Sequence, residues 1–469
     1  MLIANAEIDG KRTADVRIED GKIAAIGALA PRPAERVLNA NGGALLPGLN
    51  DHHLHLLSFA ASLNSVTCGP PAVTSEAMLI EALRARRPLD GWIRGIGYHE
   101  RVAGDIDRRW LDRHRPDVPI RIQHRTGRLW ILNSPALDLL RGTAGRSVDL
   151  PSDGRLYDAD AELRTLLGAT LPPIAAASAR LASYGVTGLS EMTHTNTNDT
   201  LRLFADLQRD GRLRQRIRVA GTRALDRAFD TAHLSVGATK VHLHETALPP
   251  FDALCRTIED SHAEDRTVAI HCVTETELVF AVEAFRSATT REGDRIEHAS
   301  VTPPALLDAL HALGLTVVTQ PNFVAERGDS YVEDLSPDTH ADLYRCASFL
   351  KRGIPLAGGT DAPFGDADPW RAMKAAVTRR TANGMLLGDE ERLTPEQALA
   401  LFTGSLAAPA QPRHVAIGVD ADLCLLDRPW AQARTVLSSE SVRATFVAGE
   451  AVFARAGDSV FDRVDQSPR

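Results

Sequence analysis

The chain has 469 residues, 44% of them hydrophobic, and its formal net charge is −8. This length is enough for one large domain with an appendage or for two or three ordinary domains, while the negative charge offers no basic surface for a nucleic acid backbone. The five cysteines are scattered, residues 1–13 lack a secretory signal and no apolar run reaches the roughly 18 residues of a membrane span, so we expect a reduced, soluble, cytoplasmic protein.

Both ends of the sequence have the pattern of short β-strands. The N-terminal strands are predicted at residues 2–8, 14–19 and 22–26. The C-terminal strands are predicted at residues 421–426, 442–447 and 451–453. Asp-Gly pairs mark turns between the N-terminal strands. We therefore expect residues 1–49 and 412–469 to form one small composite β-sandwich domain.

Strand and helix patterns alternate through the middle of the chain. Short apolar runs predict strands at residues 185–189, 239–243, 267–271, 295–297, 316–319 and 355–357. Helical patterns lie at residues 159–184, 252–265, 275–286, 303–314 and 342–353. Alternation of this kind predicts an α/β fold with a parallel sheet, and residues 50–411 fit a distorted (β/α)8 TIM barrel with insertions.

An open, doubly wound sheet is the alternative fold, but no glycine-rich phosphate loop follows any of the strands.

One further segment is rich in arginine. Residues 202–218 are expected to form a helix whose arginines face solvent.

The segment His53-Leu54-His55 follows an apolar run and a Pro-Gly break. Side chains two positions apart in a strand lie on the same side, so these imidazoles could bind one metal ion. The spacing alone is common, since His242 and His244 form a second pair. The first pair is therefore informative only if other strands supply further ligands.

Four further residues that can take part in metal binding stand at the ends of four predicted strands. They are Lys240, His271, His298 and Asp361. The carboxyl ends of the strands carry the chemistry in a TIM barrel, so these side chains should meet His53 and His55 there. The sequence thus predicts a site for one or two divalent metal ions.

Lys240 stands out because only five of the 53 basic residues are lysine. A lysine in a barrel lumen has to be paired or neutral, since an isolated buried charge is costly. A neutral lysine amine, unlike a guanidinium, can take up CO2 to become a carbamate that bridges two metals. An ion-paired or substrate-facing lysine is the alternative.

In order and number, these motifs resemble the amidohydrolase superfamily. Within it they are similar to the amidohydrolase 3 or YtcJ-like group, which includes N-substituted formamide deformylase and hydrolases of phenylureas and thiocarbamates. The matching segments cover nearly the whole chain and lie at residues 47–55, 133–137, 185–187, 239–241, 269–271, 295–298, 359–363, 393–398 and 421–423. The chain departs from these relatives at Thr126-Gly127-Arg128, where they often carry a Gly-His pair.

The resemblance implies one or two divalent ions (Zn, Co, Mn or Fe) bound in the barrel. The implied metal ligands are His53, His55, carbamylated Lys240, His271, His298 and Asp361. Asp361 would also act as general base, so that Asp361 and Lys240 are the implied catalytic residues. The implied reaction is cleavage of a C–N bond in a small amide, urea, carbamate or thiocarbamate by a metal-activated hydroxide. A homo-oligomer is compatible with the resemblance, whereas no nucleic acid or membrane partner is expected.

Several side chains near the strand ends are candidates for substrate binding. They are His194, His242, His244, Arg128, Trp130, Gln320, Asn322, Arg327 and Trp370, and a packed or surface role is the alternative for each. Deamination of a heterocyclic amine, with Glu275 as a proton shuttle, and hydrolysis of a lactone or ester are the competing reactions. A non-catalytic scaffold is disfavoured because no implied ligand is missing.

Overall fold

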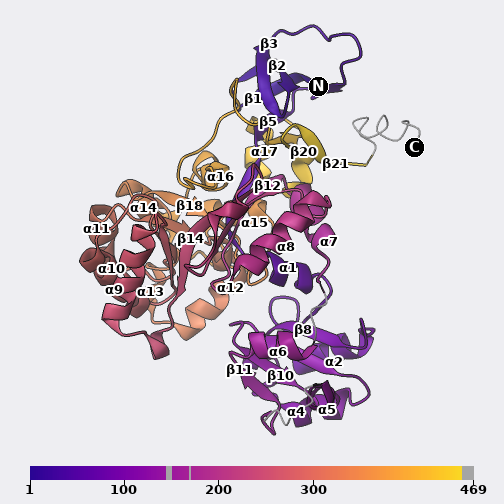
Figure 1. The fold of residues 1–469 in the computed structure, drawn as a ribbon, viewed down its shortest axis with the longest axis vertical. Helices are drawn as coiled ribbons and strands as arrows, with labels where there is room; N and C mark the ends of the chain where they lie inside the picture. The colour runs from indigo at the N-terminus through magenta and orange to yellow at the C-terminus, as the bar shows by residue number, and fades with distance from the viewer. Residues whose placement is uncertain (144–149, 168–170, 457–469) are drawn as a thin grey trace. The chain divides into compact units, whose positions relative to one another are not determined.

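The computed structural model describes residues 1–143, 150–167 and 171–456. The chain divides into two compact units, of which unit 1 comprises Met1–His55 and Ser178–Arg469 and unit 2 comprises Leu56–Ala177. Unit 1 holds the barrel and the strands from both termini (Figure 1). None of the described helices has the length and apolar character needed to cross a membrane.

The predicted barrel is confirmed by an eight-stranded parallel sheet in the order β18-β17-β16-β15-β14-β13-β12-β6. Its strands are β6 (Leu49–Leu54), β12 (Val186–Glu191), β13 (Arg216–Gly221), β14 (Leu234–His242), β15 (Val268–Cys272), β16 (Arg295–His298), β17 (Thr316–Thr319) and β18 (Leu356–Gly358). Every residue of β6, β12, β16, β17 and β18 is buried, as expected for strands covered on both faces.

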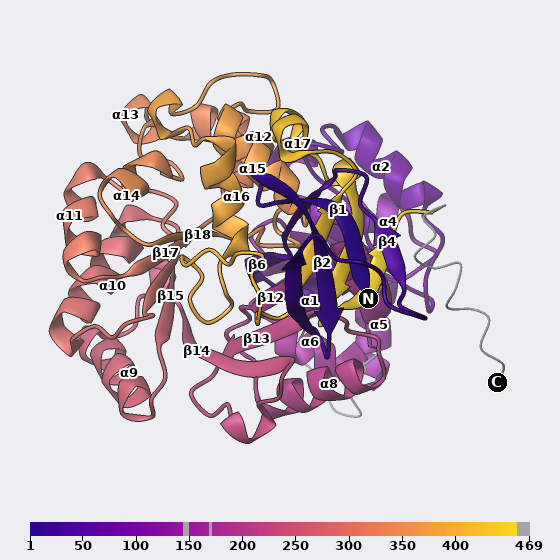
Figure 2. The same cartoon turned by 90° about the horizontal axis from the view of Figure 1, so that it is seen from above.

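Helices follow most of the barrel strands. They are α7 (Ile174–Ser183), α8 (Asn198–Arg209), α9 (Phe251–Ala263), α10 (Glu275–Ala288), α11 (Pro304–Ala312), α12 (Asn322–Asp334), α13 (Pro337–His340), α14 (Ala347–Lys351), α15 (Pro369–Thr378) and α16 (Pro395–Thr403). Figure 2 shows α9, α10 and α11 outside the strands β14 to β17. Short 3-10 turns lie at Arg227–Phe229, Glu245–Ala247 and Asp389–Glu391.

Backbone hydrogen bonds join the first barrel strand to the segment that follows the last. The Asp361 amide donates to the His53 carbonyl at 2.8 Å, and the His55 amide donates to the Ala362 carbonyl at 2.8 Å. Gly359 permits this approach, because a Cβ at this position would lie 2.5 Å from the Cβ of His53. Closure of the barrel thus places Asp361 beside the two histidines of the first strand.

Strands from both termini share a second sheet in unit 1, with the order β21-β20-β19-β5-β1-β2-β3 and β4 paired with β1. These strands are β1 (Leu2–Ile8), β2 (Arg12–Glu19), β3 (Lys22–Gly27), β4 (Val37–Asn39), β5 (Ala44–Pro47), β19 (Leu423–Leu426), β20 (Val442–Val447) and β21 (Glu450–Ala454). The helix α17 (Trp430–Val436) and a 3-10 turn at Ser439–Ser441 lie between β19 and β20 in the sequence. The ends meet where β19 pairs antiparallel with β5. Ile3, Leu45 and Phe446 lie in the core beneath this sheet.

A composite domain from both termini was expected, and its eight strands form a single hydrogen-bonded sheet. The boundaries after residues 49 and 411 stay predictions, and residues 457–469 of the predicted C-terminal part lie outside the described residues.

Unit 2 lies between β6 and β12 in the sequence and has its own five-stranded sheet in the order β11-β10-β9-β8-β7. Its elements are α1 (Leu56–Ser62), β7 (Val66–Thr67), α2 (Glu76–Ala85), β8 (Ile93–Tyr98), α3 (Glu100–Ala103), α4 (Arg108–His114), β9 (Ile120–His124), β10 (Leu129–Leu132), α5 (Ser134–Thr143), β11 (Arg155–Tyr157) and α6 (Asp160–Leu167). From the sequence, this stretch is expected only as an insertion in the barrel.

The helix predicted over residues 202–218 is wrong in its last part. Helix α8 ends at Arg209, and Arg216 begins the barrel strand β13. Ile217 and Val219 of this strand are buried, while Arg216 and Arg218 are partly buried. The arginine-rich pattern was interpreted as the solvent-facing side of a helix, but its last residues form a barrel strand.

Candidate metal centre

Three candidate metal ligands converge at the carboxyl end of the barrel. His53 is the last residue but one of β6, His55 comes directly after this strand, and Asp361 follows β18. The His53 Nε2 lies 3.6 Å from Asp361 Oδ1, and the His55 Nε2 lies 3.3 Å from the same oxygen. One donor atom from each of the three residues lies within 4.8 Å of the other two. Two imidazole nitrogens and a carboxylate oxygen are a donor set for a first-row divalent metal.

His53 is oriented by a carboxylate behind it. Its Nδ1 donates to Glu297 Oε2 at 2.5 Å, and the other carboxylate oxygen lies 2.5 Å from Arg295 Nε. All three side chains are buried. Because Nδ1 carries the proton, the Nε2 lone pair is free to bind a metal.

Two more histidines are oriented in the same way. His55 Nδ1 lies 2.9 Å from Thr193 Oγ1, and His298 Nδ1 donates to Gln320 Oε1 at 2.7 Å. In each case the partner engages Nδ1 and leaves Nε2 available. Three of the predicted ligands therefore have an arrangement typical of metal-binding imidazoles.

Six imidazoles form a continuous row across the strand ends. In order they are His55, His53, His298, His271, His242 and His194. Successive ring centroids are separated by 5.5, 4.6, 4.5, 4.2 and 5.1 Å. The row joins all four predicted histidine ligands to two of the predicted substrate residues.

Lys240 lies in β14 and is buried without a hydrogen-bond partner for its amine among the described residues. Asp361 Oδ1 is also buried, and its nearest polar neighbours among the described residues are the two imidazole nitrogens at 3.3 and 3.6 Å. Leaving such groups unpaired away from water is costly, so the lumen here suits a bound cation and a modified or neutral lysine. Burial lowers the pKa of Lys240 to about 8, against the opposing effect of Glu297.

Burial also sets the charge of the neighbouring groups. It lowers the pKa of His53 to about 3, and it lowers the pKa values of His271 and His298. Burial alone would raise the pKa of Asp361, but His55, His298 and His53 outweigh it and hold that pKa below its usual range. His53, His271 and His298 are therefore neutral and Asp361 is ionised at neutral pH, the forms that bind metals.

The segment that carries Asp361 is fixed by buried polar contacts. Thr360 Oγ1 donates to Asp51 Oδ2 at 2.5 Å, and the Thr360 amide donates to the other oxygen at 3.1 Å. Asn322 Nδ2 donates to the Thr360 carbonyl at 3.1 Å. Asp361 and His298 both have positive φ angles, 56° and 71°, which non-glycine residues rarely adopt. Strained backbone of this kind clusters at functional sites.

The remaining predicted substrate residues lie in several environments. His242 and His194 are exposed at the end of the imidazole row. His244 Nδ1 is 2.9 Å from Thr246 Oγ1 beside a 3-10 turn. Gln320 and Asn322 are buried in the contacts given above.

Two further candidates are held by backbone carbonyls. Arg327 Nη2 donates to the Phe364 carbonyl at 2.5 Å, and its guanidinium carbon lies 4.0 Å from the centre of the Phe323 ring. Trp370 is buried and its Nε1 donates to the Tyr184 carbonyl at 2.9 Å.

Arg128 and Trp130 belong to unit 2. Arg128 Nε donates to Asp158 Oδ1 at 2.6 Å, and Trp130 lies in the hydrophobic core of this unit. Contact of either residue with substrate stays a prediction. Glu275, the proposed shuttle of the deaminase alternative, is exposed at the first turn of α10.

Sequence reasoning gave no role to Glu297, Thr193 or Asp51, although each supports the site. Glu297 could have been noticed, because Arg295 and Glu297 alternate with apolar Ile296 directly before His298. Thr193 carried no signal, since its contact with His55 joins positions far apart in the chain.

Comparisons with known proteins show the family and the fold of this chain. A sequence model of the amidohydrolase family matches residues 36–453. The chain is 24% identical to the amidohydrolase YtcJ of Bacillus subtilis, covering 95% of this chain and 97% of that protein. It is also 24% identical to N-substituted formamide deformylase of Arthrobacter pascens, covering 97% of this chain and 99% of that enzyme. An uncharacterized metal-dependent hydrolase of Pyrococcus horikoshii has a similar fold, with a TM-score of 0.73, 22% identity and coverage of 91% and 97%.

Proposed function

We propose, from the premise that the chain belongs to the amidohydrolase family, that this hydrolase cleaves a C–N bond of a small amide, urea, carbamate or thiocarbamate. The observation that carries the proposal is the convergence of His53 Nε2, His55 Nε2 and Asp361 Oδ1 at the barrel mouth. The similarity to N-substituted formamide deformylase over nearly the full length of both chains supports the substrate class.

The donor set fits a divalent metal, with His53, His55 and Asp361 around one position. His271 and His298 would hold a second ion next to the first, since the His298 ring is 4.6 Å from that of His53 and 4.5 Å from that of His271. A bound divalent metal lowers the pKa of water towards neutrality and polarises a carbonyl oxygen. Zinc, cobalt, manganese and iron all accept this mixture of imidazole and carboxylate.

As a carbamate, Lys240 would supply a carboxylate-like ligand for the two proposed metal positions. Its neutral Nζ forms a bond to the carbon of CO2 and releases one proton, which leaves a carboxylate-like group in the lumen. The pKa of about 8 makes a useful fraction of the amine neutral at physiological pH. The absence of a hydrogen-bond partner for Nζ among the described residues agrees with a lysine whose native form carries additional atoms.

Asp361 would move the proton of the reaction. It is ionised at neutral pH and stands beside the two β6 histidines, so it can accept a proton from the attacking water and deliver it to the leaving nitrogen. His242 and His194 lie at the exposed end of the imidazole row, where they can contact a substrate bound beside the metal centre.

A hydrolysis screen of the metal-loaded protein tests the proposal. Formamides, ureas, carbamates and thiocarbamates form one arm, and lactones, esters and heterocyclic amines form the other. We expect turnover in the first arm that is lost in Asp361→Asn, while Asp308→Asn, which changes a surface carboxylate on α11, keeps it. Turnover confined to lactones and esters, or ammonia release from heterocyclic amines alone, would overturn the proposed reaction.

A further inference from the structure

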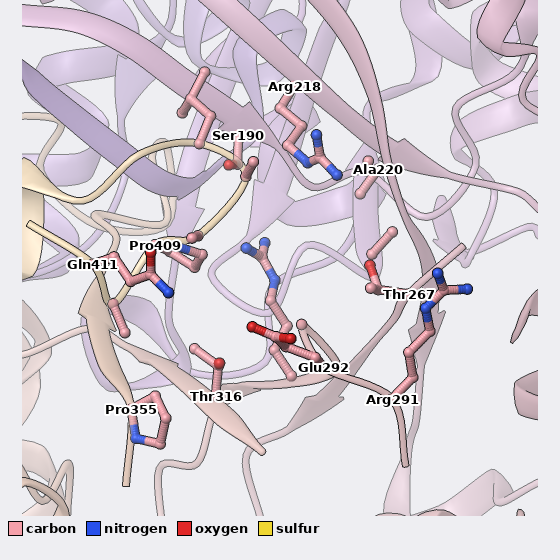
Figure 3. A pocket seen from close by; sticks show the side chains of 18 of the residues that line it. Ser190, Arg218, Ala220, Thr267, Arg291, Glu292, Thr316, Pro355, Pro409 and Gln411 are labelled. Atoms are coloured by element: carbon pink, nitrogen blue, oxygen red, sulfur yellow. The ribbon is translucent and has the colours of Figure 1, made fainter. Parts of the chain in front are cut away.

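A cavity in the barrel lumen extends from the amino ends of β15, β16 and β17 to Ser190 and Ala220 in the later halves of β12 and β13. Its volume is about 660 Å3. Thr267 precedes β15 and Thr316 begins β17, and both line the cavity (Figure 3). Gly293, which lies just before β16, lines it as well. The candidate metal ligands stand at the opposite, carboxyl ends of the same strands.

Arg218 of β13 lines this cavity without a partner of its own. Within the described part of the chain its guanidinium makes neither a hydrogen bond nor an ion pair. Its side chain is partly buried, and Figure 3 shows the guanidinium at the cavity wall near Ala220. Burial and the nearby charge of Arg295 lower the pKa of Arg218, and Asp230 only partly offsets them. An uncompensated guanidinium in such a place gains from a bound anion.

The two neighbouring strands are adapted to this arginine. Ser190 of β12 is the register partner of Arg218, and its hydroxyl is buried without a hydrogen bond among the described residues. On the other side, Gly237 of β14 leaves room for the arginine stem, because a Cβ there would lie 3.2 Å from Arg218 Cγ. A hydroxyl donor, a free guanidinium and a glycine thus stand side by side on three strands.

The other two arginines that line the cavity each have a carboxylate partner. Arg295 is held by Glu297 at 2.5 Å, and Arg291 forms an ion pair with Asp265. Glu292 is exposed and also lines the cavity, so it adds a negative charge that water screens. Arg218 is left as the cation that a ligand can neutralise.

We propose that this cavity binds a small organic carboxylate whose anionic group engages Arg218 and the Ser190 hydroxyl. A guanidinium matches a carboxylate with two parallel hydrogen bonds. The walls beside the cation are apolar and include Ala220, Ala238, Leu406 and Pro409, which suits a hydrocarbon part. This site is distinct from the metal centre, since none of the candidate metal ligands lines the cavity.

Isothermal titration calorimetry of the full-length, metal-loaded protein tests the site. The probes are sodium propionate and sodium benzoate at constant ionic strength, with inorganic phosphate and chloride as comparison anions. We expect saturable binding of the carboxylates that weakens at least about tenfold in Arg218→Gln and stays within about twofold in Arg209→Gln, a surface arginine on α8. Glu292→Gln should tighten binding, because it removes a charge of the same sign as the ligand.

A second variant separates binding from folding. Gly237→Ala crowds the Arg218 stem without altering any charge, and it should weaken carboxylate binding even if Arg218→Gln does not fold. Binding that persists unchanged in both variants would place the anion at the metal centre and overturn the proposal. Saturable binding of phosphate with none of the organic acids, or no saturable binding at all, would overturn it as well.

Discussion

His53 Nδ1 lies 2.5 Å from Glu297 Oε2, and the opposite oxygen of that carboxylate lies 2.5 Å from Arg295 Nε. The relationship ties the first barrel strand to the sixth, 244 positions later in the chain. It fixes which nitrogen of His53 faces the lumen and increases the basicity of the imidazole. The metal centre therefore depends on a carboxylate that does not itself belong to the converging donor set.

Glu297→Gln should weaken metal binding by about 10- to 100-fold, because the amide keeps an acceptor but loses the charge that polarises His53. Metal titration followed by a competing chelator gives the affinity. Glu283→Gln, an exposed residue of α10, is the control. Unchanged metal affinity in a folded Glu297→Gln protein would remove Glu297 from the site.

Lys240→Ala should lose activity and one metal equivalent if the carbamate bridges two ions. Short carboxylic acids should restore part of the activity, and this rescue should survive when Arg218→Gln is added, since none of the candidate metal ligands lines the cavity that holds Arg218. Lys374→Ala, an exposed lysine of α15, serves as the control. Full activity in Lys240→Ala or Lys240→Arg would rule out the carbamate.

Gly359→Ala should destabilise the barrel closure, because the added Cβ would meet the Cβ of His53 at 2.5 Å. We expect a loss of about 1–3 kcal/mol in the free energy of unfolding, together with weaker metal binding. Gly27→Ala is the matched control, since nothing lies within 4 Å of a Cβ at that position. Equal stability of the two variants in denaturant unfolding would contradict this view of the closure.

Stability should depend on pH through Glu326 of α12. Burial raises the pKa of this carboxyl to about 7, although hydrogen bonds from the Asp366 amide and Asn322 lower it in part. A raised pKa in the folded state means that the stabilising contribution is complete below the unfolded value of about 4.5 and is lost as the pH rises through about 7.

Glu326→Gln should therefore gain stability relative to the natural chain between these pH values, on the order of 1–2 kcal/mol. Denaturant unfolding at several pH values measures this difference, with Glu333→Gln, an exposed residue of the same helix, for comparison. A difference between Glu326→Gln and the natural chain that does not change with pH would show that Glu326 does not titrate in this range.

The barrel and its candidate ligands were predictable because each ligand ends a local apolar strand. His271 and His298 directly follow short apolar or alternating runs, and Asp361 follows a strand and two glycines. The strand order then brings these ends together, as the parallel arrangement requires.

Two parts of the fold were not predictable from local patterns. Strand β13 was assigned to a helix because Arg216 and Arg218 interrupt its apolar residues, whereas in the structure Arg218 lines the cavity. The separate sheet of unit 2 was missed as well, since none of its five strands was identified within the insertion. Contacts such as His298 with Gln320 depend on side-chain packing between neighbouring strands, which spacing alone does not specify.

The metal content of the purified protein tests the central claim most directly. Elemental analysis after loading with zinc, cobalt, manganese or iron should give one or two divalent ions per chain in the natural protein. The content should fall by at least one equivalent in His55→Ala and in Asp361→Ala, the residues whose donor atoms lie 3.3 Å apart. A folded natural protein that binds no divalent metal after reconstitution, or variants that keep the full content, would contradict the account.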